Sequence, residues 1–137
     1  MPRRRRLRKV VAPPGFKSFK PQGSKKSNKK AIELFYEEYE AIKLADFDSM
    51  SQLEASKLMG VSRPTFARIY ATARQKIAQA LVEAREITAV FGHAFLEKDW
   101  FQCSKCHSKF SLPPQADQNH CPLCQSDQFI SLNPEKI

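Results

Sequence analysis

The sequence lacks any long apolar run, and its first 30 residues contain no acidic side chain. No stretch reaches the roughly 18 apolar residues that a membrane-spanning helix needs. The charged start is not followed by the apolar segment of a secretory signal, so we expect a cytoplasmic protein. The chain also has no glycine-rich phosphate loop, no Ser/His/Asp set with supporting context and no isolated pair of carboxylates. These absences argue against an enzyme.

The positive charge of the chain is concentrated at its start. Residues 1–30 hold 12 of the 23 Lys and Arg residues, whereas residues 31–137 hold 11 cations and all 14 acids. We interpret residues 1–30 as a basic arm on a nucleic-acid backbone or minor groove, with a solvated tail or a localisation signal as the alternative. Phe16 and Phe19 indicate that the segment GFKSFKP lies back on the folded domain. The leading contact residues of the arm are Arg3, Arg4, Arg5 and Arg6.

The segment that follows Met50 has the pattern of two helices joined by a tight turn. Ser51 with Glu54 is a capping-box start, and Gly60 lies where a chain leaving a helix needs positive φ. The second helix begins after Ser62, with a proline tolerated in its first turn. Apolar residues then recur at three- and four-residue steps, at Phe66, Ile69, Tyr70, Ala73, Ile77, Ala80 and Leu81. This pattern is typical of a helix-turn-helix.

The opposite face of the second helix is polar and cationic. Between Ala55 and Val82 the sequence has five cations and no acid, which favours a polyanion partner over an ordinary basic surface helix. Arg68 and Gln75 are the leading candidates for base-edge contacts, because these side chains pair bidentately with guanine and adenine. The other candidates for base or phosphate contact are Arg63, Thr65, Thr72, Arg74 and Lys76.

The residues on either side of this motif complete a predicted three-helix domain over 31–90. Ala31–Asp48 has apolar residues at helical spacing and six acids against one lysine, so we expect a helix on the side away from nucleic acid. Residues 84–92 stay open between helix and strand, because helical periodicity continues while EITAVF is rich in β-branched residues. We expect the helix to reach about Glu86 and an extended connector to follow, with 91–98 as a linker.

All four cysteines belong to two CxxC motifs that are separated by 14 residues. A tetrahedral Zn²⁺ takes four thiolates and each CxxC turn supplies two, so structural zinc is predicted on Cys103, Cys106, Cys121 and Cys124. Iron and dithiol redox chemistry stay open as alternatives, whereas disulfides are uncommon in the cytoplasm. The spacing resembles a zinc ribbon over residues 99–134. We expect its strands at Trp100–Gln102, Lys109–Leu112 and Gln128–Leu132.

Three segments in order carry a resemblance to a known family. They are FKPQG in the arm, YEAIKLADFD in the first helix, and SQLEASKLMGVSRPTFARIYATARQKIAQAL. The last resembles region four of bacterial sigma factors. The set is similar to the domain of unknown function 134 family of small prokaryotic predicted DNA-binding proteins, over about residues 1–90. Ser56, in place of a small alanine, and the basic KKSNKK linker depart from the family pattern. The resemblance implies DNA binding and transcriptional regulation.

Together these observations predict a mainly α protein, with a sigma region-four-like, three-helix helix-turn-helix domain and a small β zinc ribbon. The expected function is a transcriptional regulator that reads double-stranded DNA in the major groove, with the arm positioning it. The alternative is an interaction module that binds RNA polymerase or RNA through the ribbon, with the arm as a general polyanion anchor. A homodimer is a further expectation, because such readers often match two-fold sites.

Overall fold

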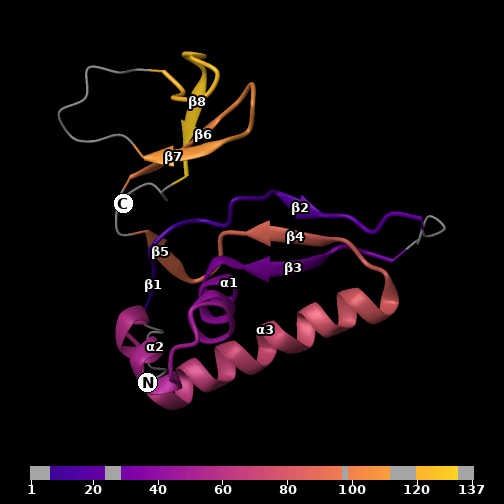
Figure 1. Cartoon of the computed structure of the whole chain (residues 1–137), viewed down its shortest axis with the longest axis vertical. Coiled ribbons are helices and arrows are strands. Elements are labelled where there is room, and N and C mark those ends of the chain that lie inside the picture. Colours follow the sequence, from indigo (N-terminus) through magenta and orange to yellow (C-terminus); the bar gives the residue numbers. More distant parts are fainter. Residues whose placement is uncertain (1–6, 24–28, 97–98, 112–119, 133–137) are drawn as a thin grey trace, which may run out of the picture.

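The computed structural model describes residues 7–23, 29–96, 99–111 and 120–132 (Figure 1). Its helical segments are α1 (Tyr36–Ile42), the π-helical η1 (Lys43–Phe47), α2 (Gln52–Met59) and α3 (Arg63–Glu83). Its strands are β1 (Arg8–Val10), β2 (Ser18–Phe19), β3 (Ile32–Phe35), β4 (Ile87–Val90), β5 (Ala94–Leu96), β6 (Trp100–Cys103), β7 (Lys109–Ser111) and β8 (Phe129–Ser131). In this part of the chain, none of the helices has the length and apolar character that a membrane crossing requires.

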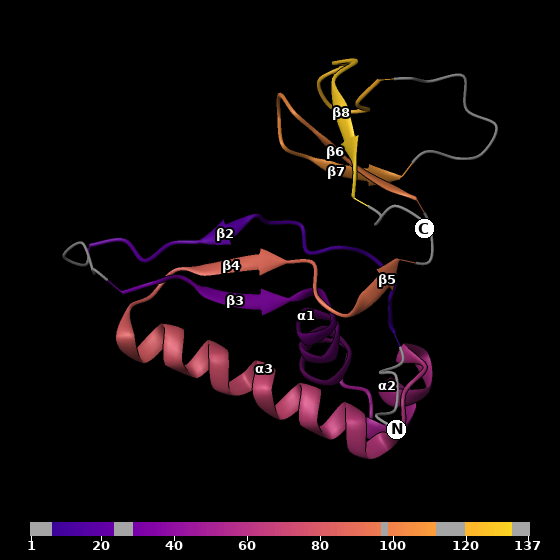
Figure 2. The same ribbon diagram turned by 180° about the vertical axis from the view of Figure 1, so that it is seen from behind.

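The strands of the described residues form three small sheets. β1 pairs in parallel with β5. In the second sheet β4 is central, antiparallel to β2 and parallel to β3. In the third, β6 pairs antiparallel with both β7 and β8. We call this last unit the ribbon. Figures 1 and 2 show α1 and α3 on one side of the β2–β4–β3 sheet and the ribbon on the other.

The expectation of a mainly α fold is wrong, because the described residues form a mixed α/β structure. The helix expected over Ala31–Asp48 begins only at Tyr36, and the residues before it form β3. The helix expected to reach Glu86 ends at Glu83, and β4 follows, so the strand alternative for this segment is the correct one. β3 and β4 stabilise each other as parallel neighbours, although they are far apart in the sequence. Local periodicity does not reveal such a pairing.

The two helices that the sequence predicts on either side of Gly60 are present. The Ser51 hydroxyl accepts a hydrogen bond from the Glu54 amide at 3.1 Å, and the Ser62 hydroxyl accepts one from the Thr65 amide at 3.3 Å. Gly60 ends α2 with φ at 68°, the left-handed conformation that turns the chain into α3. The local signals in the sequence therefore set both helix starts and the turn between them.

Two apolar clusters hold the helices and the strands together. The first lies between the helices and consists of Ala41, Leu44, Ala55, Met59 and Phe66, each at most 3% exposed. The second joins β1, β5 and the start of α1 through Val10, Tyr36, Ala94 and Leu96. Trp100 and Leu132 of the ribbon pack against this second cluster. The ribbon is therefore docked on the strands rather than separated from them.

The described part of the basic arm is built into the fold. We call residues 7–23 the N-terminal strap. It runs from the β1–β5 pair to the β2–β4 pair, and Pro14 is fully buried between them. The ring of Phe16 lies edge-on to Phe19, with centroids 4.6 Å apart, and 6.2 Å from the ring of Tyr39. The prediction that GFKSFKP lies back on the folded domain is confirmed.

Three acidic side chains of α1 are buried, and each accepts a hydrogen bond from a backbone amide. The pairs are Glu37 with His93 at 2.8 Å, Glu38 with Phe35 at 2.9 Å, and Glu40 with Val11 at 3.3 Å. A buried carboxylate without such partners would be costly. These bonds attach the β4–β5 connection, the end of β3 and the N-terminal strap to one helix.

Candidate nucleic-acid interface and metal centre

The outer face of α3 is exposed and cationic. Figures 1 and 2 show the helix along one side of the molecule, with the β2–β4–β3 sheet between it and the ribbon. Its buried face carries Phe66, Ala73 and Ala80. Five of the residues predicted to bind DNA are exposed on this helix: Arg63, Arg68, Thr72, Arg74 and Gln75. Because a 21-residue helix is rigid on this scale, the structure brings these five side chains together on one element.

The first turn of α3 is organised by its cap. Thr65 is half-buried, and its hydroxyl oxygen accepts a hydrogen bond from the Ser62 hydroxyl at 2.9 Å. The Arg68 guanidinium also donates to this oxygen, at 3.5 Å. Thr65 therefore serves the helix start, whereas most of the five N–H donors of Arg68 have no partner within the described part of the chain.

Arg74 lies on the flank of the face beside an aromatic ring and an acid. Its guanidinium is 5.3 Å from the Tyr70 ring centroid, and its Nε atom is 4.0 Å from Asp46 Oδ2. The Tyr70 hydroxyl donates a hydrogen bond of 2.6 Å to Asp46, which raises the pKa of Tyr70. The Arg74 side chain is still 64% exposed. These contacts orient the guanidinium without removing it from solvent.

Lys76 does not join this group. Its ammonium donates to Glu38 Oε1 at 2.7 Å and to the Glu33 carbonyl at 2.9 Å, and it lies 4.2 Å from the Phe35 ring centroid. These contacts join α3 to α1 and β3. The four contact residues predicted in the arm, Arg3–Arg6, lie outside the described residues.

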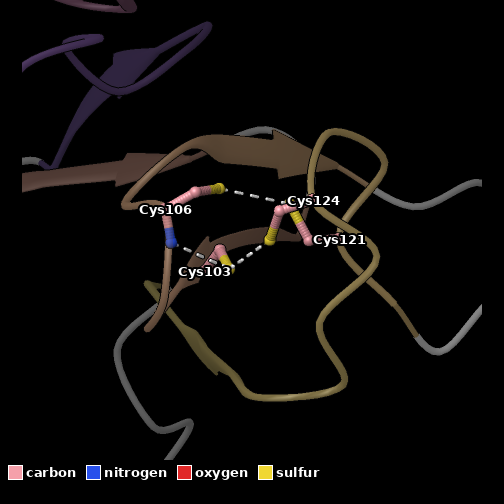
Figure 3. A group of neighbouring side chains, drawn as sticks. All are labelled: Cys103, Cys106, Cys121 and Cys124. Carbon is pink, nitrogen blue, oxygen red and sulfur yellow. Dashed lines mark hydrogen bonds between the residues drawn. The ribbon is translucent and has the colours of Figure 1, made fainter.

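The four cysteine side chains converge at one end of the ribbon, as Figure 3 shows. All four sulfur atoms lie within 4.8 Å of one another, with Cys103 and Cys124 at 3.4 Å and Cys106 and Cys121 at 3.5 Å. A tetrahedron of thiolates around zinc has sulfur–sulfur edges of about 3.8 Å. The cluster is therefore compatible with one metal ion bound by four sulfurs.

The two CxxC turns have the same backbone hydrogen bonds. In the first, the His107 amide donates to the Cys103 carbonyl at 3.0 Å, and in the second the Gln125 amide donates to the Cys121 carbonyl at 2.9 Å. His107 and Gln125 both have positive φ, at 64° and 62°. The Ser104 amide donates to the Gln128 carbonyl at 2.9 Å and so joins the first turn to the segment before β8. Because the two turns share one geometry, each presents its cysteine pair to a common point.

The thiol pKa values differ across the cluster. The Ser108 hydroxyl, 3.2 Å from the Cys121 sulfur, lowers the pKa of Cys121 to about 6. The backbone amide of Cys106 lowers the pKa of Cys103. The Ser126 amide acts in the same direction on Cys124, but burial and the neighbouring sulfurs outweigh it and raise the pKa of Cys124 to about 11. The hydrogen bonds to Cys103 and Cys121 thus shift both thiols toward the thiolate, the form in which cysteine binds a metal.

The three strands predicted for the ribbon are confirmed to within one residue at each end, as β6, β7 and β8. Phe101, Phe110 and Phe129 pack beside the buried cysteines, with ring centroids 5.3–5.9 Å apart. This apolar cluster is small, so it buries little apolar area for a unit of this size.

The comparisons with known proteins agree with the resemblance found in the sequence. Residues 1–96 match the family described as "Protein of unknown function DUF134". The chain belongs to this family. A UPF0251 protein of Chloroherpeton thalassium is 41% identical over 132 residues, which cover 96% of this chain and 87% of that protein. A UPF0251 protein of Methanothermobacter thermautotrophicus is 34% identical over the whole chain and 71% of its own length. No solved structure matches.

Sequence reasoning missed one residue that connects the parts of this DUF134 protein. Lys109 in β7 donates hydrogen bonds to the carbonyls of Pro14 and Phe16 in the N-terminal strap, the latter at 3.2 Å. Its ammonium also lies 5.7 Å from the Tyr36 ring centroid. Nothing near position 109 indicates these partners, because the accepting carbonyls are more than 90 residues away in the chain.

Proposed function

We propose that this protein is a cytoplasmic DNA-binding transcriptional regulator and not an enzyme. In this proposal α2 and α3 are a helix-turn-helix, and α3 enters the major groove of double-stranded DNA. The observation that carries it is the outer face of α3, where Arg68, Thr72 and Gln75 are exposed at helical spacing. No acid occurs between Ala55 and Val82 to repel phosphates.

The exposed residues divide by the contacts that their side chains suit. Arg68 and Gln75 are proposed to read base edges, because a guanidinium pairs with guanine and an amide with adenine. Arg63 and Arg74, which lie three helical turns apart on the same flank of α3, are proposed to contact phosphates, since cations on a flank position a reader without specifying sequence. The cations of residues 1–30 add a contact to the backbone or minor groove.

The resident metal is proposed to be structural zinc. Four thiolates leave no open coordination position, and zinc is the common ion in a site of this kind. The support is the convergence of the four sulfurs and the matched backbone geometry of the two turns. Elemental analysis of protein purified without added metal tests it. One zinc per chain is the expected result, and one iron per chain with a visible absorption band would overturn the assignment.

The DNA proposal is tested by selection on random duplexes, followed by affinity measurements at fixed salt. Arg68→Ala should weaken binding to the selected duplex by about 1–3 kcal/mol and relax the preference at one base pair. Lys25→Ala removes one cation from the basic arm and is the matched control; it should weaken binding to all DNA sequences by the same factor. Equal losses for both variants on selected and random DNA would contradict sequence reading by α3. That result would instead favour a protein anchored to polyanions by charge alone.

A further inference from the structure

A cavity of about 320 Å³ lies between the β2–β4–β3 sheet and the ribbon. Its walls come from segments far apart in the chain. Lys17 precedes β2, Tyr36 begins α1, and Lys109 lies in β7. The first CxxC turn and β6 complete the wall through Ser104, His107 and Gln102. The cavity therefore exists only because the ribbon is docked on the sheet.

The described residues that line this cavity include two lysines and a histidine but no carboxylate. Tyr36, Gln102 and Ser104 add a hydroxyl, an amide and a second hydroxyl, all of which can donate hydrogen bonds. Among the described residues, the Lys17 ammonium has no hydrogen-bond or ion-pair partner. A concave site with cations and hydrogen-bond donors and without a carboxylate is complementary to an anion, and Cys103, the one thiol in its lining, lies with its sulfur 3.4 Å from that of Cys124 in the sulfur cluster.

Lys109 is held in place before any ligand arrives. Two of its three ammonium N–H groups are directed to the carbonyls of Pro14 and Phe16. The ammonium is half-buried, and this burial lowers the pKa of Lys109. The charge is therefore costly where it stands, and an anion in the cavity would offset that cost. A lysine fixed by backbone carbonyls also loses little freedom on binding.

We propose that this cavity binds a small phosphate-bearing anion, held by Lys17 and Lys109 and by the hydroxyl and amide donors around them. The volume is at the lower end of small-molecule sites, which suits one or two phosphate groups or a mononucleotide. The site is not a second contact for DNA that is bound to α3. Figures 1 and 2 show α3 on the opposite side of the β2–β4–β3 sheet from the ribbon, so one duplex in contact with α3 lies on the far side.

The test uses the full-length, metal-loaded protein with inorganic pyrophosphate and adenosine 5′-monophosphate as probes in calorimetric titrations. Saturable binding of one probe molecule per chain is expected. Lys17→Gln should lower the affinity for pyrophosphate by at least about fivefold, because it removes one charge-assisted contact. Lys20→Gln removes the same charge from an exposed residue of the strap that does not line the cavity, and should change affinity less than about twofold. Ser104→Trp places a large side chain at the exposed rim of the cavity and should abolish pyrophosphate binding by filling the cavity.

The outcomes separate the cavity from the general charge of the arm. No saturable binding of either probe, or equal weakening by Lys17→Gln and Lys20→Gln, would overturn the proposal. Displacement of pyrophosphate by a stoichiometric DNA duplex would also overturn it, because the cavity would then belong to the nucleic-acid surface. Far-UV circular dichroism and metal content verify that each variant is folded. Failure here leaves the α3 proposal intact, because Arg68→Ala is scored on DNA alone.

Discussion

Lys76→Met is predicted to damage the fold rather than DNA recognition. The Lys76 side chain is 23% exposed, and its partner Glu38 is 6% exposed. The substitution keeps an apolar side chain of similar length but removes the ammonium and its contact with the Phe35 ring. Glu38 would then be a buried carboxylate whose remaining hydrogen bond comes from the Phe35 amide. The Glu33 carbonyl would lose its donor as well.

The expected magnitude follows from these contacts. Removing one partner of a fully buried ion pair costs about 3–5 kcal/mol, because the other charge is left uncompensated. Lys76 is partly exposed, so water reduces this cost to roughly 2–3 kcal/mol. The lost bond to the Glu33 carbonyl adds about 1 kcal/mol. We therefore expect Lys76→Met to lower the free energy of unfolding by about 3–4 kcal/mol.

The assay is urea unfolding of the metal-loaded protein, followed by circular dichroism at 222 nm. Lys57 is an exposed residue of α2, and Lys57→Met is the matched control, which should change stability by less than about 0.5 kcal/mol. Adding Glu38→Gln to Lys76→Met should restore part of the loss, because it neutralises the stranded carboxylate. A loss below about 1 kcal/mol, or strict additivity of the two substitutions, would refute the reasoning. Under conditions where the variant is folded, its DNA affinity should stay within about twofold of the parent.

Three further predictions follow from single contacts. Gly92→Ala should cost about 1–3 kcal/mol in urea unfolding because its Cβ would overlap Cβ and Cγ of Phe35 as well as the Glu37 carboxylate, whereas Gly15→Ala meets open space and should be neutral. Burial raises the pKa of the Glu40 carboxyl above its ordinary 4.5, so the folded state binds the carboxyl proton more tightly than the unfolded state. The stability that this proton contributes is present at low pH and is lost as the pH rises through the pKa of the folded state. The Glu40→Gln variant should therefore be more stable than the parent protein at pH 7, by about 1 kcal/mol in urea unfolding. This advantage should disappear below pH 4.5, where Glu40 is protonated in both states. Equal stability of the two proteins at pH 7 would contradict the prediction. Chelation should change the fluorescence of Trp100, the single tryptophan, while the signal at 222 nm from α3 persists; loss of both together would show that the helices depend on the metal.

The parts of the structure that the sequence predicts correctly are those set by local chemistry. The caps at Ser51 and Ser62 and the left-handed Gly60 define helix ends through neighbours within a few residues. The CxxC spacing predicts the cluster of four sulfurs for the same reason. Each turn forms its own backbone hydrogen bonds, and a metal site requires only that the two turns lie side by side. The family resemblance is independent of both and is confirmed by the match over residues 1–96.

The parts that were missed depend on partners distant in the sequence. β1 pairs with β5, and β3 pairs with β4, across gaps that contain the whole helical region. β2 is only two residues long, too short for an alternating pattern to appear. Residues 32–35 alternate between buried and exposed positions, yet the apolar positions within this segment also fit helical spacing. Only the parallel neighbour β4 decides between the two.

The acids of α1 show how burial changes the meaning of charge in a sequence. Six acids over Ala31–Asp48 predict a helix kept away from phosphates, but Glu37, Glu38 and Glu40 are buried acceptors for backbone amides. Their role is to attach segments that have few strand partners. One of them also engages Lys76, the cation of α3 that faces inward. The cations on the outer face of α3 are therefore not offset by α1 itself, and Asp46 in η1 is the acid of this region that reaches one of them, Arg74. Because these carboxylates are used inside the fold, the outer face of α3 stays cationic, which is the property that the proposed contact with DNA needs.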